Sequence, residues 1–220
     1  MRSRLRQAKR ASHQRYAARL VIMIKEPVAG RVKTRLARGV GTVTATAAYR
    51  AMLSSLVARL SGDRRWQTIL AVSPDNGCNS RMLPARHLLT LPQGHGDLGH
   101  RLQRVFDRLP PGPAVVIGTD IPAIRPEDIA AAFRQLGSND AVFGPSSDGG
   151  YWLVGLKRAR RIPRAFADVR WSTEHALADT KDNLAGQRIA QLRGLDDVDS
   201  AYDLAQQRQI IGRRVPPRQT

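Results

Sequence analysis

The sequence predicts an α/β fold built on a mostly parallel sheet, and three observations indicate it. Short apolar segments of strand length alternate along the chain with longer segments of helical periodicity. The first apolar segment, Leu20–Ile24, is continuous and rich in β-branched residues, as in a strand buried on both faces. With 220 residues and 42% hydrophobic content, the chain can bury one substantial core, so one domain is expected.

The individual elements follow from these patterns in chain order. Strands are expected at Leu20–Ile24, Thr68–Val72, Leu88–Leu91, Ala114–Gly118, Ala141–Gly144, Tyr151–Leu156 and Ile189–Leu192. Helices are expected at Thr44–Leu60, Leu98–Leu109, Pro126–Leu136, Thr173–Gln187 and Ser200–Ile210. Pro126 is typical of a first helical turn, and Asp97 can cap the helix that starts at Leu98.

The chain is strongly basic, with a net charge of +18. We expect residues 1–19, which hold seven basic and no acidic residues, to form a basic disordered extension; a transit peptide or a nucleic-acid-binding arm are the alternatives. Residues 20–210 are then the folded domain and 211–220 a basic tail. No apolar segment has the length of a signal peptide or membrane span, which predicts a soluble cytoplasmic protein. Cys78 is the only cysteine, so an internal disulfide is excluded.

A cluster of basic residues follows the first strand, where open α/β sheets bind ligands. The loop matches neither G-x-x-x-x-G-K-[ST] nor G-x-G-x-x-G. Gly30 allows a close turn, while Lys33 and Arg35 can neutralise phosphate oxygens. An exposed basic turn is the alternative. The candidate phosphate-binding residues are Lys25, Pro27, Gly30, Lys33, Thr34 and Arg35.

Two carboxylates lie on loops next to expected strands. Asp120 follows the buried strand that ends at Gly118, and it is the best candidate metal ligand, although a cap of a helix or turn is the alternative. Asp148 lies in a Gly-rich turn before Tyr151, where a plain hairpin turn is the alternative. Carboxylate oxygens suit Mg²⁺ or Mn²⁺, which complete their coordination with phosphate and water.

Six motifs occur in order between about Leu20 and Leu204. They are K-E-P-x-x-G-x-V-K-T-R-L, G-D-L-G-x-R, G-T-D-I-P, G-P-x-x-D-G-G-Y, W-S-T and D-V-D-S-x-x-D-L. Together they resemble the transferase 1, radical-SAM/selenodomain-associated family, whose members are often called arsenosugar-biosynthesis glycosyltransferases. That family resembles the nucleotide-diphospho-sugar transferase superfamily. The resemblance implies a GT-A-like, Rossmann-like three-layer sandwich with a mixed sheet; the first loop is also similar to that of 2-phospholactate guanylyltransferases.

The resemblance also implies roles for individual residues. Lys25, Lys33 and Arg35 would hold the donor phosphates, and Asp120 would bind the metal. Asp148 would help to bind metal or acceptor. Asp199 would supply a second metal contact, with Asp197 as the fallback. The sequence departs from a full D-x-D motif because Gly118 stands where its first Asp would be.

Weaker candidates have structural alternatives. Asp97 and Arg101 either contact the nucleotide or form a helix cap and a surface pair. Gly149, Gly150, Tyr151 and Trp171 are candidates for the acceptor or sugar site, but Trp171 also fits a helix entry with Ser172 as the N-cap. The five histidines show no metal-binding spacing.

The sequence therefore predicts a transferase that depends on Mg²⁺ or Mn²⁺ and binds a nucleotide or nucleotide-sugar. Its catalytic residues would be Asp120, Asp148 and Lys33, and together with Asp199 they should share one cleft, because the strand ends meet at one sheet edge. Glycosyl transfer to a small acceptor is favoured over nucleotidyl transfer by the resemblance. An inactive polyanion-binding protein is the second alternative. Low aromatic content makes nucleic acid an unfavoured partner.

Overall fold

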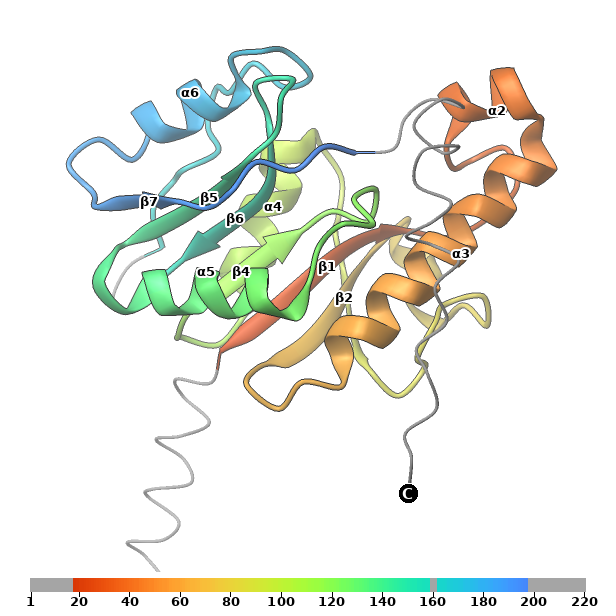
Figure 1. Ribbon diagram of the computed structural model, residues 1–220, viewed down its shortest axis with the longest axis horizontal. Coiled ribbons are helices and arrows are strands. Elements are labelled where there is room, and N and C mark those ends of the chain that lie inside the picture. The colour runs from red at the N-terminus through yellow and green to blue at the C-terminus, as the bar shows by residue number, and fades with distance from the viewer. Residues whose placement is uncertain (1–17, 159–161, 198–220) are drawn as a thin grey trace, which may run out of the picture.

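The computed structural model describes residues 18–158 and 162–197, and its centre is a seven-stranded sheet of order β3-β2-β1-β4-β6-β5-β7 (Figure 1). The strands are β1 (Arg19–Lys25), β2 (Gln67–Ser73), β3 (Leu89–Pro92), β4 (Ala114–Ile117), β5 (Ala141–Pro145), β6 (Tyr151–Leu156) and β7 (Ile189–Gln191). Strands β3, β2, β1 and β4 pair in parallel, whereas β6 runs antiparallel to both β4 and β5. Strand β7 pairs in parallel with β5 at one edge. The mostly parallel, mixed α/β sheet is confirmed.

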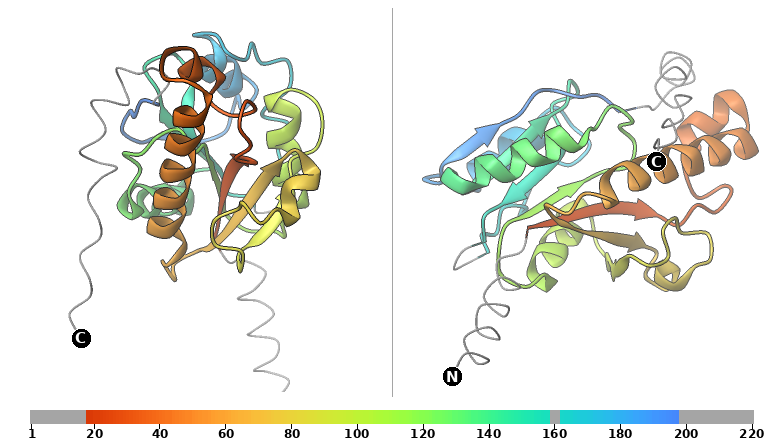
Figure 2. Two further views of the ribbon diagram at one scale, coloured as in Figure 1. Left: turned by 90° about the vertical axis from the view of Figure 1, so that its right-hand side faces the viewer. Right: turned by 60° about the horizontal axis from the view of Figure 1, so that its bottom comes forward.

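Helices cover both faces of the sheet (Figures 1 and 2). The helical elements are α2 (Thr34–Val40), α3 (Thr42–Ser61), the 3₁₀ helix η1 (Asp75–Asn79), α4 (Leu98–Arg108), α5 (Pro126–Ser138) and α6 (Ala176–Asp182). Helices α3 and α5 lie on one face and α4 on the other, which gives three layers.

The alternation of side chains along β1 explains the two cores. Leu20, Ile22 and Ile24 point into the core shared with α3 and α5, while Val21 joins the core beneath α4. All four side chains are almost completely buried. A continuous apolar run is therefore what a strand between two helical layers requires.

The expected strands are confirmed to within one residue at each end, but the helices differ more. Helix α6 begins at Ala176 and ends at Asp182, so the expected helix over Thr173–Gln187 is too long. Ser172 is not its N-cap, because its backbone φ of 61° belongs to a tight turn in which the Thr173 hydroxyl donates to Arg170 O. Helix α2 was not expected from the sequence. The expected helix Ser200–Ile210 lies outside the described residues.

Candidate functional site

A pocket of about 290 Å³ opens where the carboxyl ends of β1 and β4 lie side by side. The antiparallel strand β6 begins at the same edge, and residues at the start of α4 also line the pocket. The polar residues of the pocket are Lys25, Lys33, Tyr49, Gln93, Arg101, Thr119, Asp120 and Tyr151. This is the position at which open α/β sheets bind ligands.

The loop after β1 is fixed at its start by two side chains of α3. The Tyr49 hydroxyl accepts from Lys25 N at 2.9 Å and donates to Lys25 O at 3.0 Å. Arg50 donates from Nη2 to Pro27 O at 2.9 Å. Gly30 follows with a backbone φ of 78°, which favours glycine, and no atom would meet a Cβ there. The loop is therefore anchored at its base and open at its tip.

Lys33 and Asp120 meet at the mouth of the pocket. The Lys33 Nζ atom lies 3.1 Å from Asp120 Oδ2, and the exposed fractions of the two side chains are 6% and 41%. Lys33 reaches this position from a left-handed backbone conformation, φ 47° and ψ 45°, immediately before α2. The ammonium is thus almost enclosed, while the carboxylate keeps a face open to ligand.

Other predicted residues also line the pocket. Lys25 ends β1, and Arg101 is oriented by its Nε, which donates to Gly96 O at 2.9 Å. The Tyr151 ring stacks edge-on against Phe143 and Trp171, and burial raises the pKa of its hydroxyl. Tyr151 thus lines the pocket. Trp171 contacts the Tyr151 ring but does not line the pocket itself.

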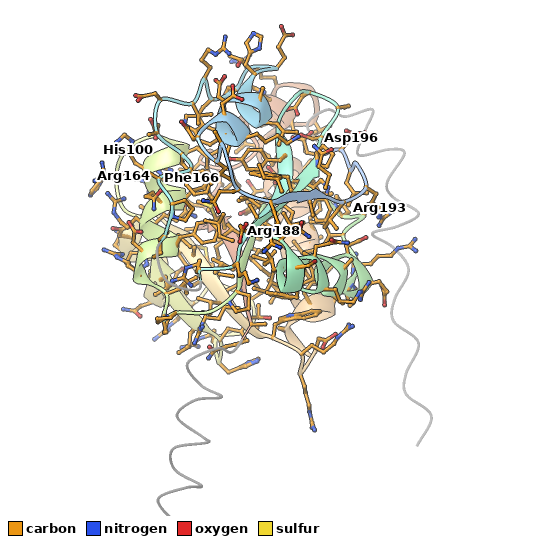
Figure 3. All side chains as sticks on the ribbon, turned by 90° about the vertical axis from the view of Figure 1, so that its left-hand side faces the viewer. His100, Arg164, Phe166, Arg188, Arg193 and Asp196 are labelled. Carbon is orange, nitrogen blue, oxygen red and sulfur yellow. The ribbon has the colours of Figure 1, made fainter. Side chains whose placement is uncertain are left out.

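Several predicted site residues lie away from the pocket. Thr34 and Arg35 are exposed residues of helix α2, so they do not belong to an open loop as expected. Asp97 caps α4 by accepting from His100 N at 2.9 Å, and it also binds the His100 ring, in agreement with the capping alternative. Figure 3 shows His100 on the α4 side of the molecule, together with Arg164 and Phe166.

Asp148 is held within its own turn. Its Oδ1 atom accepts from Ser146 Oγ and from Gly150 N, and Asp148 does not line the pocket. Asp196 holds the same turn by accepting from Ser147 N at 2.9 Å, near the edge strand β7 (Figure 3). The structure thus brings Lys33 to Asp120 but does not add Asp148 to the pair. Asp199 lies outside the described residues, and Asp197 is exposed.

The number of protein carboxylates at the pocket limits how a metal ion could bind. Within residues 18–158 and 162–197, no group of three His, Cys, Asp or Glu residues could hold a metal ion. Asp120 therefore offers one protein carboxylate at the pocket mouth. This donor set fits Mg²⁺ or Mn²⁺, which often bind through one or two carboxylates and take phosphate and water oxygens as further ligands.

Three of the polar pocket residues named above were missed by the sequence analysis: Tyr49, Gln93 and Thr119. Gln93 is the first residue after β3 and Thr119 the second after β4, so a search of every strand end would have found them. Tyr49 lies inside a helix, and nothing in its sequence neighbourhood indicates that its hydroxyl reaches back to Lys25.

Replacing Tyr49 by Phe should lower the free energy of unfolding by about 1–3 kcal/mol, because Lys25 N and O lose their partner. Burial raises the pKa of Tyr49 to about 12 from a usual value of 10.0. Between these values the folded protein holds a proton that the unfolded chain releases, so this stability is present below pH 10 and falls as the pH rises toward 12. Urea unfolding at pH 8 and pH 11 should show a steeper loss for wild type than for Tyr49→Phe. Equal losses of unfolding free energy in the two proteins would contradict the link between the Tyr49 proton and stability.

Replacing Gly149 by Ala should destabilise the protein by more than about 1 kcal/mol. Its backbone φ is 81°, and a Cβ at this position would overlap with Glu174 O. Gly186 is the matched control, since it has the same φ of 81° but no atom within 4 Å of a Cβ. Urea unfolding of Gly149→Ala and Gly186→Ala separates the overlap from backbone strain, and equal losses would mean that the Glu174 contact has no effect.

A family model described as "Uncharacterized protein conserved in bacteria (DUF2064)" matches residues 56–173, just over half of the chain. The chain belongs to the DUF2064 family. The segment that matches the DUF2064 model includes four polar residues of the pocket, namely Gln93, Arg101, Asp120 and Tyr151. None of the curated proteins matches the chain.

Solved structures share this fold. The chain resembles a proposed nucleotide-diphospho-sugar transferase of Desulfovibrio desulfuricans G20, with 26% identity, a TM-score of 0.75 and coverage of 86% of this chain and 85% of that one. It also resembles 4-diphosphocytidyl-2C-methyl-D-erythritol synthase of Anaerococcus prevotii DSM 20548, with 11% identity, a TM-score of 0.57 and coverage of 90% and 100%. Glucosyl-3-phosphoglycerate synthase of Mycobacterium tuberculosis, in complex with Mn²⁺, UDP and phosphoglyceric acid, matches with 12% identity, a TM-score of 0.55 and coverage of 94% and 82%. The GT-A-like fold is confirmed.

Proposed function

We propose that the DUF2064 chain is a transferase that uses a nucleotide-sugar donor and a divalent metal ion to move a glycosyl group to a small acceptor. The observation that carries this proposal is the contact of Lys33 with Asp120, 3.1 Å apart at the mouth of a pocket between β1 and β4. The likeness to the Desulfovibrio protein over most of both chains supports a nucleotide-sugar donor. The finer assignment to the transferase 1, radical-SAM/selenodomain-associated group belongs to this proposal.

Three charged residues of the pocket have a task in that reaction. Lys33 and Arg101 neutralise phosphate oxygens from two sides, Lys33 as a point charge and Arg101 through the guanidinium nitrogens that Gly96 leaves available. Asp120 would hold Mg²⁺ or Mn²⁺, which would supply electrostatic stabilisation of the charge that develops on the phosphate. Lys33 keeps the Asp120 carboxylate oriented before ligand arrives.

Nucleotidyl transfer is the second candidate, and the concentration of basic residues favours it. Lys25, Lys33 and Arg101 line one pocket, and a nucleoside triphosphate carries more negative charge for them to neutralise than a nucleotide-sugar does. Both reactions use the same residues for the phosphates. They differ in the leaving group, which is a nucleoside diphosphate in glycosyl transfer and pyrophosphate in nucleotidyl transfer.

The test is incubation of the protein with radiolabelled nucleotide-sugars and nucleoside triphosphates, with Mg²⁺ or Mn²⁺ and extracts of small acceptors. Release of a nucleoside diphosphate supports glycosyl transfer, and release of pyrophosphate supports nucleotidyl transfer. Absence of both, together with absence of nucleotide binding by calorimetry, would contradict the proposal. Strand β1 begins at Arg19, which is buried, so the expected extension over residues 1–19 is too long by at least that residue. The full-length protein and one lacking residues 1–17 should bind nucleotide equally. The part of the chain that the structure describes holds no helix long and apolar enough to span a bilayer.

A further inference from the structure

Gln93 is a nearly buried residue of the pocket lining, and both hydrogens of its side-chain amide are used in hydrogen bonds. The residue follows β3, is 4% exposed and lines the pocket. Its Nε2 atom donates to Ile24 O of β1 at 3.0 Å and to Ala71 O of β2 at 2.7 Å. Both amide hydrogens are therefore used to join the ends of two strands.

These two bonds fix the orientation of the amide. Two carbonyl oxygens can be met only by an NH₂ group, so exchanging the amide oxygen and nitrogen would place acceptor against acceptor. The backbone of Gln93 is also held, because its N donates to Val72 O at 3.0 Å and its O accepts from Arg104 Nη1 at 2.9 Å. The side-chain oxygen, Oε1, thus has one fixed direction.

Oε1 is an acceptor available to a ligand. Within the described ranges this oxygen accepts no hydrogen bond. It is also not one of the side-chain atoms there that are both fully buried and without a hydrogen-bond partner. The backbone of the neighbouring β1 end is already satisfied, since Tyr49 takes both Lys25 N and Lys25 O. Gln93 therefore supplies an acceptor of fixed direction to the pocket.

We propose that Gln93 determines nucleobase specificity by accepting a hydrogen bond from an N–H group of the base. This inference rests on the proposed function, which places the phosphates at Lys33 and Asp120, at the mouth. The base would then lie on the Gln93 side of the pocket, which also has the apolar lining residues Met23, Leu102 and Val154. A base that offers no N–H there leaves a nearly buried acceptor unpaired, which costs far more binding than a lost surface contact.

The experiment measures binding of ADP, GDP, CDP and UDP by calorimetry, followed by donor deletion in the tightest ligand. The analogues carry purine for adenine, hypoxanthine or N1-methylguanine for guanine, 2-pyrimidinone for cytosine and N3-methyluracil for uracil. Wild type should bind the analogue about 10- to 100-fold more weakly. Gln93→Met, which keeps the volume but removes the acceptor, should bind ligand and analogue within about twofold of each other.

Gln103→Met is the matched control, because it makes the same substitution on α4 at a residue that does not line the pocket, and it should keep the wild-type ratio. The inference is overturned if wild type does not discriminate any of these analogues from its ligand, a result that needs no variant to fold. Retained discrimination in Gln93→Met overturns it as well. Failure of all four diphosphates to bind would instead remove the proposed function on which the inference rests.

Discussion

Replacement of Asp120 by Asn is expected to lower kcat by at least about 100-fold, the effect of removing one group that stabilises transition-state charge. The amide cannot hold a divalent metal as a carboxylate does, and it leaves Lys33 without its anionic partner at 3.1 Å. The fold should remain, because Asp120 lies beyond β4 with 41% of its side chain exposed. Steady-state rates with Mg²⁺ and Mn²⁺, compared with thermal unfolding, measure the two effects separately.

Asp107→Asn is the control for this substitution. Asp107 is an exposed residue of α4 outside the pocket, and Asn keeps the Oδ1 atom that accepts from Gln103. Its activity should equal that of wild type. Full activity of Asp120→Asn at saturating metal would remove Asp120 from the reaction, whatever the contact with Lys33 suggests.

The Lys33→Ala variant should bind nucleotide about 1.5–3 kcal/mol more weakly, the range for a hydrogen bond to a charged group. The physical reason is that the Lys33 ammonium, with only 6% of the side chain exposed, is directed into the pocket mouth. The loss should shrink for the matching nucleoside without phosphates, and calorimetry with both ligands measures the difference. This comparison removes any general effect of leaving Asp120 unpaired.

Arg35→Ala and Arg38→Ala test how far the phosphate site extends along α2. We expect Arg35→Ala to weaken nucleotide binding less than Lys33→Ala, because Arg35 is exposed and does not line the pocket. Arg38→Ala, one turn further along α2, should leave nucleotide binding unchanged.

The Lys33 prediction has its own contrary outcome. Equal losses of nucleotide and nucleoside binding in Lys33→Ala would mean that Lys33 supports the fold instead of binding phosphate.

The sheet and the meeting of Lys33 with Asp120 could be predicted because both depend on features that a sequence displays. A buried parallel strand needs a continuous apolar run, as in β1, and the carboxyl ends of parallel strands share one edge. Helix α2 could not be predicted in the same way. It has seven residues and buries only Leu36, so it has no periodic apolar face to recognise.

The interior of the site was hidden for a different reason. Gln93 and Tyr49 act on backbone atoms of Ile24, Ala71 and Lys25, and backbone atoms leave no residue-specific signal in a sequence. Asp148 shows the converse. Its sequence neighbourhood resembles a ligand loop, but Ser146 and Gly150 are the partners that occupy its Oδ1.

At Lys33, the residue that the backbone conformation favours differs from the residue that the chemistry of the pocket needs. A residue with a Cβ at φ 47° and ψ 45° is strained by about 1–2 kcal/mol, and glycine would relieve that strain. Glycine would also delete the ammonium that faces Asp120. The backbone conformation therefore favours glycine at this position, while the contact with Asp120 favours lysine.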